Sequence, residues 1–424
     1  MDSNFMPTVL LPSPLGPEAP IGEILLAETA IRIELPPSQH RLAVERYNAI
    51  RKYIERPESP LCDHVSLFYP QGSMAIRATI KARKREDGYD IDIIAELLLS
   101  ALTPPGEVLD LLFLAINGPH GSLYHGKVKR QTRCVTVEYE DGMHLDVTPS
   151  ILADRFDLRK STIFHAKKEE PISTHRRLLM NTHAFIEWFN ARAPIDLAFG
   201  EAYAMRAQAN DRMLMKAAAP AKSVPAHSKN EGGKSSVVVA LQLLKRNRNI
   251  KYAHRDGRMP PSVMMACFAG HAALPGNSIS GALEVVSGHM LSALEAAQAS
   301  RQLIDVRNPE CPDECFTDRW PEDLRAQQTY ISDLKVLRHQ LALLMSSELS
   351  LPQKRDLLIS MFGEGPAESV INDFADQLGQ GVRSGTRMIA PTGRVMIGAA
   401  AAASAIIKPA AVQAAQHTFY GTSW

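Results

Sequence analysis

The chain has 424 residues, which is long enough for two or three domains with a large buried core. Its 47 Lys and Arg residues almost balance its 46 Asp and Glu residues, so the formal net charge is +1. Proteins that bind long DNA or RNA usually carry a clear basic excess, so we expect no long nucleic acid among the partners.

The predicted elements begin after a proline-rich leader, residues 1–20, which carries five of the 28 prolines. This leader lacks a basic start followed by a sustained apolar core, so we expect no signal peptide. A helix is predicted from Ser38 to Ile54, because Ser38 can act as its N-cap and the apolar residues that follow recur on one stripe at helical spacing.

Four short segments between Val65 and Val147 are rich in β-branched residues and bounded by Gly, Pro and Asp-Gly turns, which is typical of strands. The stretch from Glu140 to Gly142 lies between two of them and predicts a tight hairpin turn. We therefore predict a sheet-bearing domain over residues 21–165. The four segments are VSLFYPQGS, YDIDIIAEL, RCVTVEYE and MHLDVTPS.

After Pro149 the pattern becomes helical, and we predict a helical lobe over residues 166–350 followed by a short helical segment over 351–380. The Gly- and Ala-rich end, residues 381–424, predicts a flexible tail. Within the lobe, the stretch from Ala217 to Gly233 predicts a linker. The helices predicted in the lobe are Thr174–Asn190, Lys234–Asn247, Pro261–Leu274, Ile279–Ala297 and Trp320–Leu349.

The cysteines and the apolar segments indicate in which cellular compartment we expect the protein. Five cysteines lack the density and even number of a disulfide framework, and the longest apolar run, Val395–Ile407, is too short for a membrane span. We therefore expect a cytoplasmic protein with no membrane partner. Cys267, His271, Cys311 and Cys315 are residue types that bind zinc, but nothing in the sequence shows that they converge.

Three aspartates are the strongest chemical signal. Asp90 and Asp92 alternate in YDIDII, so in a strand both carboxylates share one face while the isoleucines point into the core. Cations between two such carboxylates relieve their repulsion, and Mg²⁺ takes oxygen ligands of this kind together with substrate phosphates. Asp146 in MHLDV would complete a two-metal site from a neighbouring strand. On its own, Asp-x-Asp is also compatible with an exposed strand face.

Gly72 and Ser73 form a turn after an apolar strand, where backbone N–H groups and a hydroxyl are available to a triphosphate. Gly-Ser, then Asp-x-Asp, then a separate strand Asp is the order found in polymerase-β-like nucleotidyltransferases, which this sequence resembles. More narrowly, QGSMAIRATI, DGYDIDIIAEL, HLDVTPS, LQLLKRNRN and PPSVMMACFAGHA are similar to segments of the bacterial cGAS/DncV-like nucleotidyltransferases (CD-NTases), over about residues 20–345.

The resemblance implies an α/β (α+β) fold with two lobes: a mixed-sheet cage, a long N-terminal spine helix spanning both lobes, and a C-terminal helical lobe. It implies an enzyme that makes a cyclic di- or trinucleotide second messenger for anti-phage defence, from ATP and possibly GTP or another nucleoside triphosphate. Asp90, Asp92 and Asp146 would be catalytic and would bind two Mg²⁺ (or Mn²⁺) ions. The residues implied to bind nucleotide are Gln71, Gly72, Ser73, Lys245 and Ser262.

Several alternatives stay open on the sequence alone. The basic segment KARKRED lengthens the interval between Ser73 and Asp90 relative to the superfamily, and it is either a solvated loop or a hairpin near the incoming triphosphates. Lys245 is also compatible with a solvated helix face. Two alternative functions stay open: the synthesis of a linear oligoadenylate, and a catalytically silent scaffold that binds nucleotides.

The tail suggests a protein partner. Some relatives are activated when a partner similar to ubiquitin-activating enzymes couples their small C-terminal residue to another protein. Here the chain ends at the bulky Trp424, so we expect a docking segment that is either trimmed to Gly421 or not conjugated. The alternative is an aromatic end that folds back onto the chain.

Overall fold

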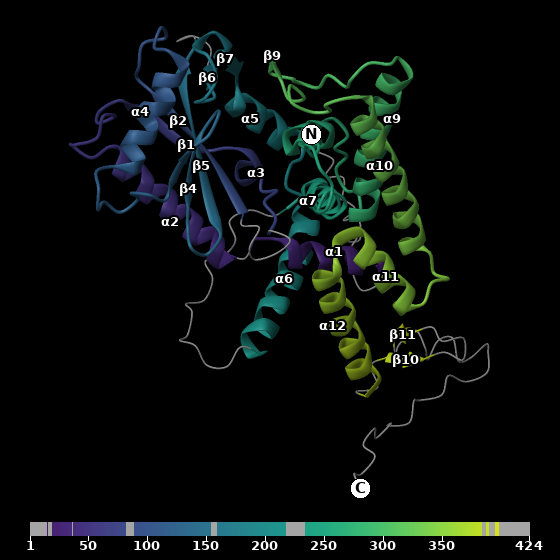
Figure 1. Ribbon diagram of the computed structural model, residues 1–424. Helices are drawn as coiled ribbons and strands as arrows, with labels where there is room; N and C mark the ends of the chain where they lie inside the picture. Colours follow the sequence, from purple (N-terminus) through teal and green to yellow (C-terminus); the bar gives the residue numbers. More distant parts are fainter. Residues whose placement is uncertain are drawn as a thin grey trace, which may run out of the picture. The chain divides into compact units, whose positions relative to one another are not determined.

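The computed structural model describes residues 15, 19–35, 37–81, 89–153, 159–217, 234–383, 387–389 and 395–397. The chain divides into two compact units, Met1–Leu349 and Ser350–Trp424. The first unit contains a mixed β-sheet and a set of helices (Figure 1), so the predicted α/β fold class is confirmed.

The sheet has seven strands, in the order β1-β2-β5-β4-β3, with β6 paired to β5 and β7 paired to β6. β2 and β5 run parallel at its centre, and all the other pairs are antiparallel. The four predicted strands and the hairpin turn at Gly142 are confirmed. The strands are β1 (Val65–Pro70), β2 (Tyr89–Leu97), β3 (Val128–Arg130), β4 (Val135–Glu138), β5 (Met143–Leu152), β6 (Ser161–His165) and β7 (Arg176–Met180).

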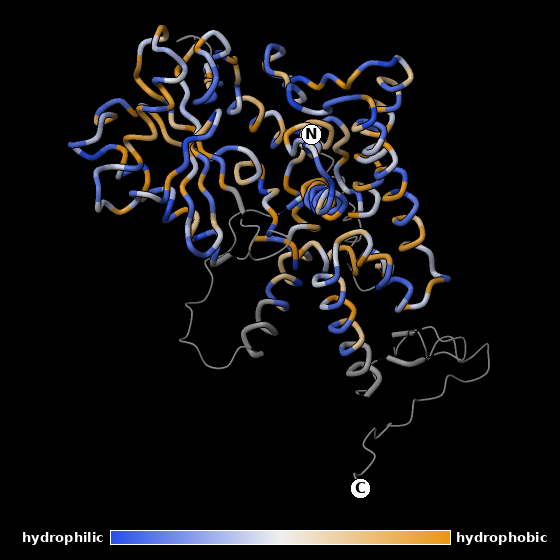
Figure 2. The backbone as a smooth tube through the Cα atoms, in the orientation of Figure 1, coloured by the Kyte–Doolittle hydropathy of each residue, from blue (hydrophilic) through white to orange (hydrophobic). Residues whose placement is uncertain are grey.

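The core lies on one face of this sheet, under α2 (Pro37–Ile54) and α4 (Pro105–Asn117). Ile91 and Ile93 of β2 are buried there with residues from both helices, and the strands carry hydrophobic colours along much of their length (Figure 2). Since side chains alternate along a strand, the residue between these two isoleucines, Asp92, lies on the opposite face.

The predicted N-terminal helix is confirmed as α2, but a second helix, α1 (Ile21–Ile33), precedes it. α1 ends at Ile33 and α2 begins at Pro37, a residue that suits the first turn of a helix because the backbone donor it lacks would have no partner there. α1 contacts α6 (Leu197–Ala217), α7 (Ser236–Lys251), α9 (Ile279–Ala299) and α10 (Leu324–Met345), whereas α2 packs with α4 on the sheet. The two helices together, rather than Ser38–Ile54 alone, therefore pack against both the sheet and the helical part of the unit.

The helical part of the first unit surrounds α7, which contacts α1, α8 and α9. Every residue of α7 from Ser236 to Arg248 is buried, although the last four of these are polar or charged. The helices are α5 (Thr182–Arg192), α6 (Leu197–Ala217), α7 (Ser236–Lys251), α8 (Ser262–His271), α9 (Ile279–Ala299) and α10 (Leu324–Met345). Short elements are α3 (Gly72–Ala75), η2 (Ile172–Thr174), β8 (Arg307–Asn308) and β9 (Cys311–Cys315).

Two of the predicted helices start four or more residues later than expected. The helix predicted from Thr174 begins at Thr182, because residues Arg176–Met180 pair with β6 as a strand, and the Asn181 side chain caps α5 by accepting from Ala184 N. The helix predicted from Trp320 begins at Leu324, where Asp323 is the N-cap. Pairing with β6 overrides the local helix preference of Arg-Arg-Leu-Leu-Met.

The second unit contains α11 (Leu351–Phe362) and α12 (Glu364–Arg383), followed by β10 (Arg387–Ile389) paired with β11 (Val395–Ile397). Most of the predicted tail, the predicted linker and the KARKRED segment lie outside the described residues. In the described part of the chain, no helix has both the length and the apolar character needed to cross a membrane.

Candidate active site

The register of the two central strands brings two of the three predicted aspartates together. Asp92 of β2 lies directly opposite Asp146 of β5, and Asp90 lies opposite His144. Thr136 of β4 donates a hydrogen bond from Oγ1 to Asp146 Oδ1 at 2.5 Å, which fixes that carboxylate. The Asp90 side chain lies outside the described residues.

The Gly-Ser turn lies directly against Asp92. Gln71 N donates to the Asp92 backbone carbonyl at 2.8 Å, which ties the end of β1 to β2. Gly72 has φ +59°, and a Cβ atom at this position would lie 2.5 Å from Asp92 Oδ2. Only glycine therefore allows the turn to approach the carboxylate this closely.

Lys245 of α7 reaches across to the Gly-Ser turn. Its Nζ donates to Ser73 Oγ at 2.6 Å and to the Ala78 carbonyl at 2.8 Å, and the residue is 5% exposed, so the alternative of a solvated helix face is wrong. Burial, together with a smaller effect of Arg248, lowers the pKa of the Lys245 ammonium to about 7, and Asp92 opposes this shift.

Arg248 is a second buried cation, one helical turn after Lys245. It donates from Nη1 to the Pro260 carbonyl at 2.7 Å and to Ser262 Oγ at 2.9 Å, so it holds the start of α8 in place. Burial lowers the pKa of its guanidinium to about 10. Within the described residues, neither Lys245 nor Arg248 forms a salt bridge with a carboxylate. α7 therefore carries two buried, positively charged side chains one helical turn apart.

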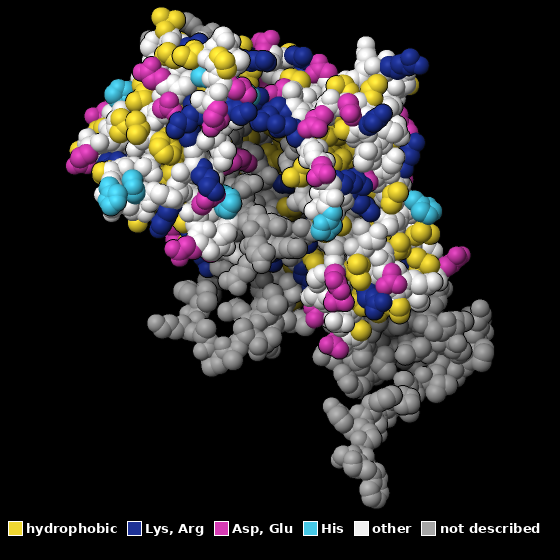
Figure 3. Space-filling view, viewed as in Figure 1, with side chains coloured by type: hydrophobic (Ala, Val, Ile, Leu, Met, Phe, Trp, Pro, Cys, Tyr) yellow, Lys and Arg dark blue, Asp and Glu magenta, His cyan; other side chains and the backbone are white. Residues whose placement is uncertain are grey.

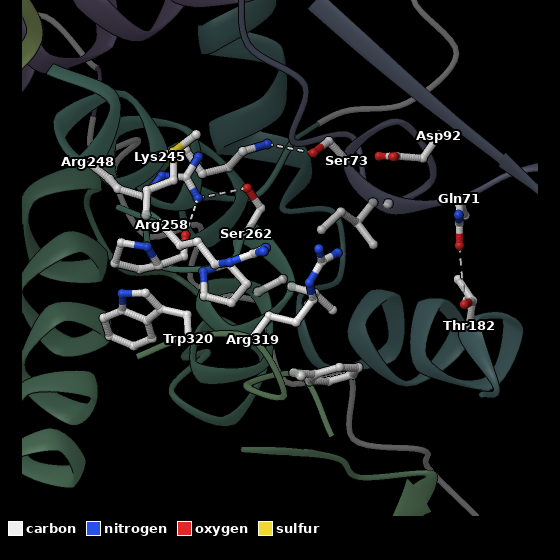
Figure 4. Close-up of a pocket in the computed structure, with 18 of the residues that line it drawn as sticks. Gln71, Ser73, Asp92, Thr182, Lys245, Arg248, Arg258, Ser262, Arg319 and Trp320 are labelled. Carbon is white, nitrogen blue, oxygen red and sulfur yellow. Dashed lines mark hydrogen bonds between the residues drawn. The ribbon is translucent and has the colours of Figure 1, made fainter. Parts of the chain in front are cut away.

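These residues line a cavity of about 1050 Å³ between the sheet and the helical part of the unit. Figure 4 shows Lys245 and Ser73 joined at one end, Asp92 and Gln71 beside them, and Arg248 joined to Ser262. The cavity lining includes six of the eight predicted site residues: Gln71, Gly72, Ser73, Asp92, Lys245 and Ser262. It does not include Asp146, and the placement of the Asp90 side chain is not described.

Sequence reasoning missed several other residues of this cavity. Arg248 is three residues after Lys245 and hence on the same helix face, which is a signal that was available. Arg133, Arg258 and Arg319 also line the cavity but come from loops far apart in the sequence, and no pattern connects them. Figure 3 shows Lys and Arg side chains gathered beside a hollow on the face that it displays. Arg133 forms an ion pair with Asp318 and donates to His165 Nδ1 at 3.1 Å.

The described side chains bear on the two kinds of metal site that the sequence suggests. Among the described side chains, which exclude that of Asp90, no group of three or more His, Cys, Asp and Glu residues could hold a metal ion. This finding covers Cys267, His271, Cys311 and Cys315, which do not form a zinc site. Asp92 and Asp146 offer hard oxygen donors on adjacent strands, so they suit Mg²⁺ or Mn²⁺ rather than zinc.

Comparison with known proteins identifies the family. No family model matches the sequence. The chain is 41% identical to the cyclic dinucleotide synthase CdnG of Bradyrhizobium diazoefficiens over 99% of both chains. It is 23% identical to a c-di-GMP synthase of Roseivirga ehrenbergii, over 94% of this chain and 97% of that one. The structure of the Bradyrhizobium CD-NTase CdnG in complex with GTP superposes with a TM-score of 0.72 and 40% identity, covering 85% of this chain and 100% of that one.

Identity at this level over nearly the whole chain agrees with the two-lobed fold and with the cavity that faces Asp92. The chain belongs to the CD-NTase family of nucleotidyltransferases, which are enzymes that synthesise cyclic oligonucleotides.

Proposed function

We propose that this chain condenses two nucleoside triphosphates, at least one of them GTP, into a cyclic dinucleotide. In each of the two steps a ribose hydroxyl oxygen attacks an α-phosphorus atom, a phosphodiester bond forms and pyrophosphate leaves. The observation that carries the proposal is a pair of buried cations, Lys245 and Arg248, that face the Gly-Ser turn and Asp92 across one cavity.

The buried cations support a triphosphate site. An unpaired buried charge costs several kcal/mol, and this cost is recovered when an anion binds. Lys245 already reaches the Ser73 hydroxyl at 2.6 Å, so a phosphate oxygen that replaces this contact would meet an ammonium, a hydroxyl and the backbone of a glycine turn together. Arg248 acts indirectly, because its guanidinium positions Ser262 at the start of α8.

The aspartates support a divalent-metal site. Asp90, Asp92 and Asp146 would hold two Mg²⁺ or Mn²⁺ ions, and bound divalent ions would neutralise charge on the phosphates and lower the pKa of a coordinated hydroxyl. The residues fit this role because the strand register pairs Asp92 with Asp146 and the Thr136 hydroxyl orients the latter. Asp146 would orient the attacking ribose hydroxyl and accept its proton on the carboxylate oxygen that Thr136 does not occupy.

The choice of GTP rests on the 40%-identical CD-NTase CdnG, whose structure is a complex with GTP. The matching CdnG sequence is that of a cyclic dinucleotide synthase, which supports a product of two nucleotides. ATP, which the family resemblance suggests, stays a prediction for the second nucleotide. Anti-phage signalling, a cytoplasmic setting and a protein partner at the tail are likewise proposals drawn from the family.

The test is nucleotide incorporation by the purified full chain with each triphosphate singly and in pairs, in the presence of Mg²⁺. Asp92→Asn keeps the shape of the side chain but removes one ligand charge, so turnover should fall by about 10²-fold or more. Glu45→Gln, which changes an exposed carboxylate on α2, is the matched control and should leave the rate unchanged. Near-normal incorporation by Asp92→Asn would show that the chemistry takes place elsewhere.

A further inference from the structure

A partly buried carboxylate on the cavity wall has no place in the proposed chemistry. Glu314, in β9, lines the cavity together with Thr182 and Phe185 of α5. Burial raises the pKa of its carboxyl group, and no Lys, Arg or His in the described part of the chain forms a salt bridge with it. An ionisable group that is buried in a cleft without a cation partner is a candidate for ligand recognition.

The hydrogen bonds that the described residues donate to Glu314 all reach one of its two carboxylate oxygens. Oε2 accepts from Asn181 N at 2.9 Å and from Asn308 Nδ2 at 2.7 Å. These two donors fix the carboxylate at the N-terminus of α5 and account for the lone pairs of Oε2. Oε1 accepts no hydrogen bond from the described residues, so its two lone pairs remain available to a group in the cavity.

The surroundings of Glu314 suit a flat aromatic ligand near the reacting groups. Phe185 and Phe316 lie edge to face with ring centroids 5.0 Å apart, and both line the same cavity. Thr182, which follows Asn181, donates from Oγ1 to Gln71 Oε1 at 3.3 Å (Figure 4). Gln71 precedes Gly72, so a short series of contacts connects Glu314 to the Gly-Ser turn.

Carboxylate chemistry then selects among the bases. Guanine carries two adjacent donors, N1–H and the N2 amino group, on its Watson–Crick edge. Adenine presents the N1 acceptor at the corresponding position and would repel a carboxylate, and uracil flanks its single N3–H with two carbonyl oxygens. A fixed acceptor with no competing cation therefore favours guanine over adenine and uracil.

We propose that Glu314 determines base specificity, and that its Oε1 accepts the N1–H and N2–H groups of a guanine held between the sheet and α5. This inference rests on the proposed function, because it assigns a base to the nucleotide that the cavity binds. It names the residue that makes GTP, rather than ATP, the occupant of this part of the cavity.

The first experiment needs no variant. Affinities of the wild-type chain are measured for α,β-methylene triphosphates, which cannot release pyrophosphate, of guanosine, N1-methylguanosine, inosine and 7-deazaguanosine. The N1-methyl compound should bind about 10- to 100-fold more weakly than guanosine, which is the usual discrimination of one well-formed base contact. Inosine should be weakened less, and 7-deazaguanosine should bind like guanosine. Tolerance of the N1-methyl group, or a loss confined to 7-deazaguanosine, would overturn the assignment.

The second experiment uses Glu314→Gln, with Glu310→Gln as the matched control on an exposed carboxylate in the turn between β8 and β9. Glutamine can still accept from Asn181 N and Asn308 Nδ2, but it turns an amino group toward the base. The ratio of GTP affinity to ATP affinity should fall about 10- to 100-fold, while the melting temperature without nucleotide stays near that of the control. If the melting temperature falls and the affinity ratio does not, Glu314 only caps α5 and the inference is wrong.

The two proposals fail in different ways. If the wild-type chain binds no triphosphate, both are overturned. If it binds GTP and ATP and makes a cyclic product, but Glu314→Gln leaves the affinity ratio unchanged, only the role of Glu314 is overturned. If Glu314→Gln does not fold, the analogue series with the wild-type chain decides by itself.

Discussion

Gly72→Ala tests the close approach between the Gly-Ser turn and Asp92. The substitution has two separable costs. A non-glycine residue at φ +59° loses about 1–2 kcal/mol of stability, because its Cβ meets the backbone in the left-handed region. In addition, the new Cβ would lie 2.5 Å from Asp92 Oδ2, and ordinary van der Waals contact begins at 3.4 Å, so the carboxylate must move by about 0.9 Å.

A displacement of that size at a reacting centre costs about 10²-fold in rate. We therefore expect kcat/KM for nucleotide incorporation to fall about 100-fold, while the free energy of unfolding falls by only about 1–2 kcal/mol. The assay pairs initial rates with denaturant unfolding of the same preparation.

Gly121→Ala is the matched control for this prediction. Gly121 also has positive φ, +82°, but nothing lies within 4 Å of the Cβ that alanine would add. It should show the stability loss without the rate loss. Equal rates for the two variants, or a Gly72→Ala enzyme within threefold of wild type, would refute the argument that Asp92 packs against this glycine.

Two further predictions concern the buried cations. The folded pKa of Lys245, about 7, lies below the 10.5 of an ordinary lysine, so between these values the unfolded chain binds more protons than the folded one and stability should rise with pH. A triphosphate favours the protonated form of Lys245, so KM for the nucleotide should rise from pH 7 to 9 in the wild type and should lose this pH dependence in Lys245→Met. Initial rates measured across this pH range test both expectations, and a wild-type KM that does not change with pH would contradict them. Arg248→Lys keeps the charge but cannot hold Pro260 O and Ser262 Oγ with one planar group, so KM should rise about 10-fold with kcat less affected. An unchanged KM would show that Arg248 does not contribute to triphosphate binding.

The sequence predicts the sheet well because its strands have strong local signals. YDIDIIAEL and MHLDVTPS alternate apolar and polar residues, and the structure pairs them as β2 and β5 with Asp92 opposite Asp146. Neighbouring elements were missed although local signals existed. Pro104 and Pro105 at the start of α4, and Gly118 with φ +64° at its end, mark a helix that the strand-rich surroundings concealed.

Other features depend on contacts between distant segments, and no local pattern encodes them. Arg176–Met180 becomes a strand only because β6 is beside it. The contact of Glu314 with Asn181, 133 residues away, forms only when β9 reaches the start of α5. For the same reason the sequence alone indicates a nucleotide site at Ser73 and Lys245 but no base-reading residue. The domain boundaries and the roles of the individual site residues stay predictions.

Product analysis is the most direct test of the central claim. The full wild-type chain is incubated with GTP, alone and with ATP, in Mg²⁺, and the products are treated with phosphatase and analysed by mass spectrometry. We predict a cyclic dinucleotide containing guanine, which resists phosphatase because it has no terminal phosphate, and which is absent with EDTA or with Asp92→Asn. Products that are only linear and phosphatase-sensitive, or guanine-free, or formed equally by Asp92→Asn, would contradict the account.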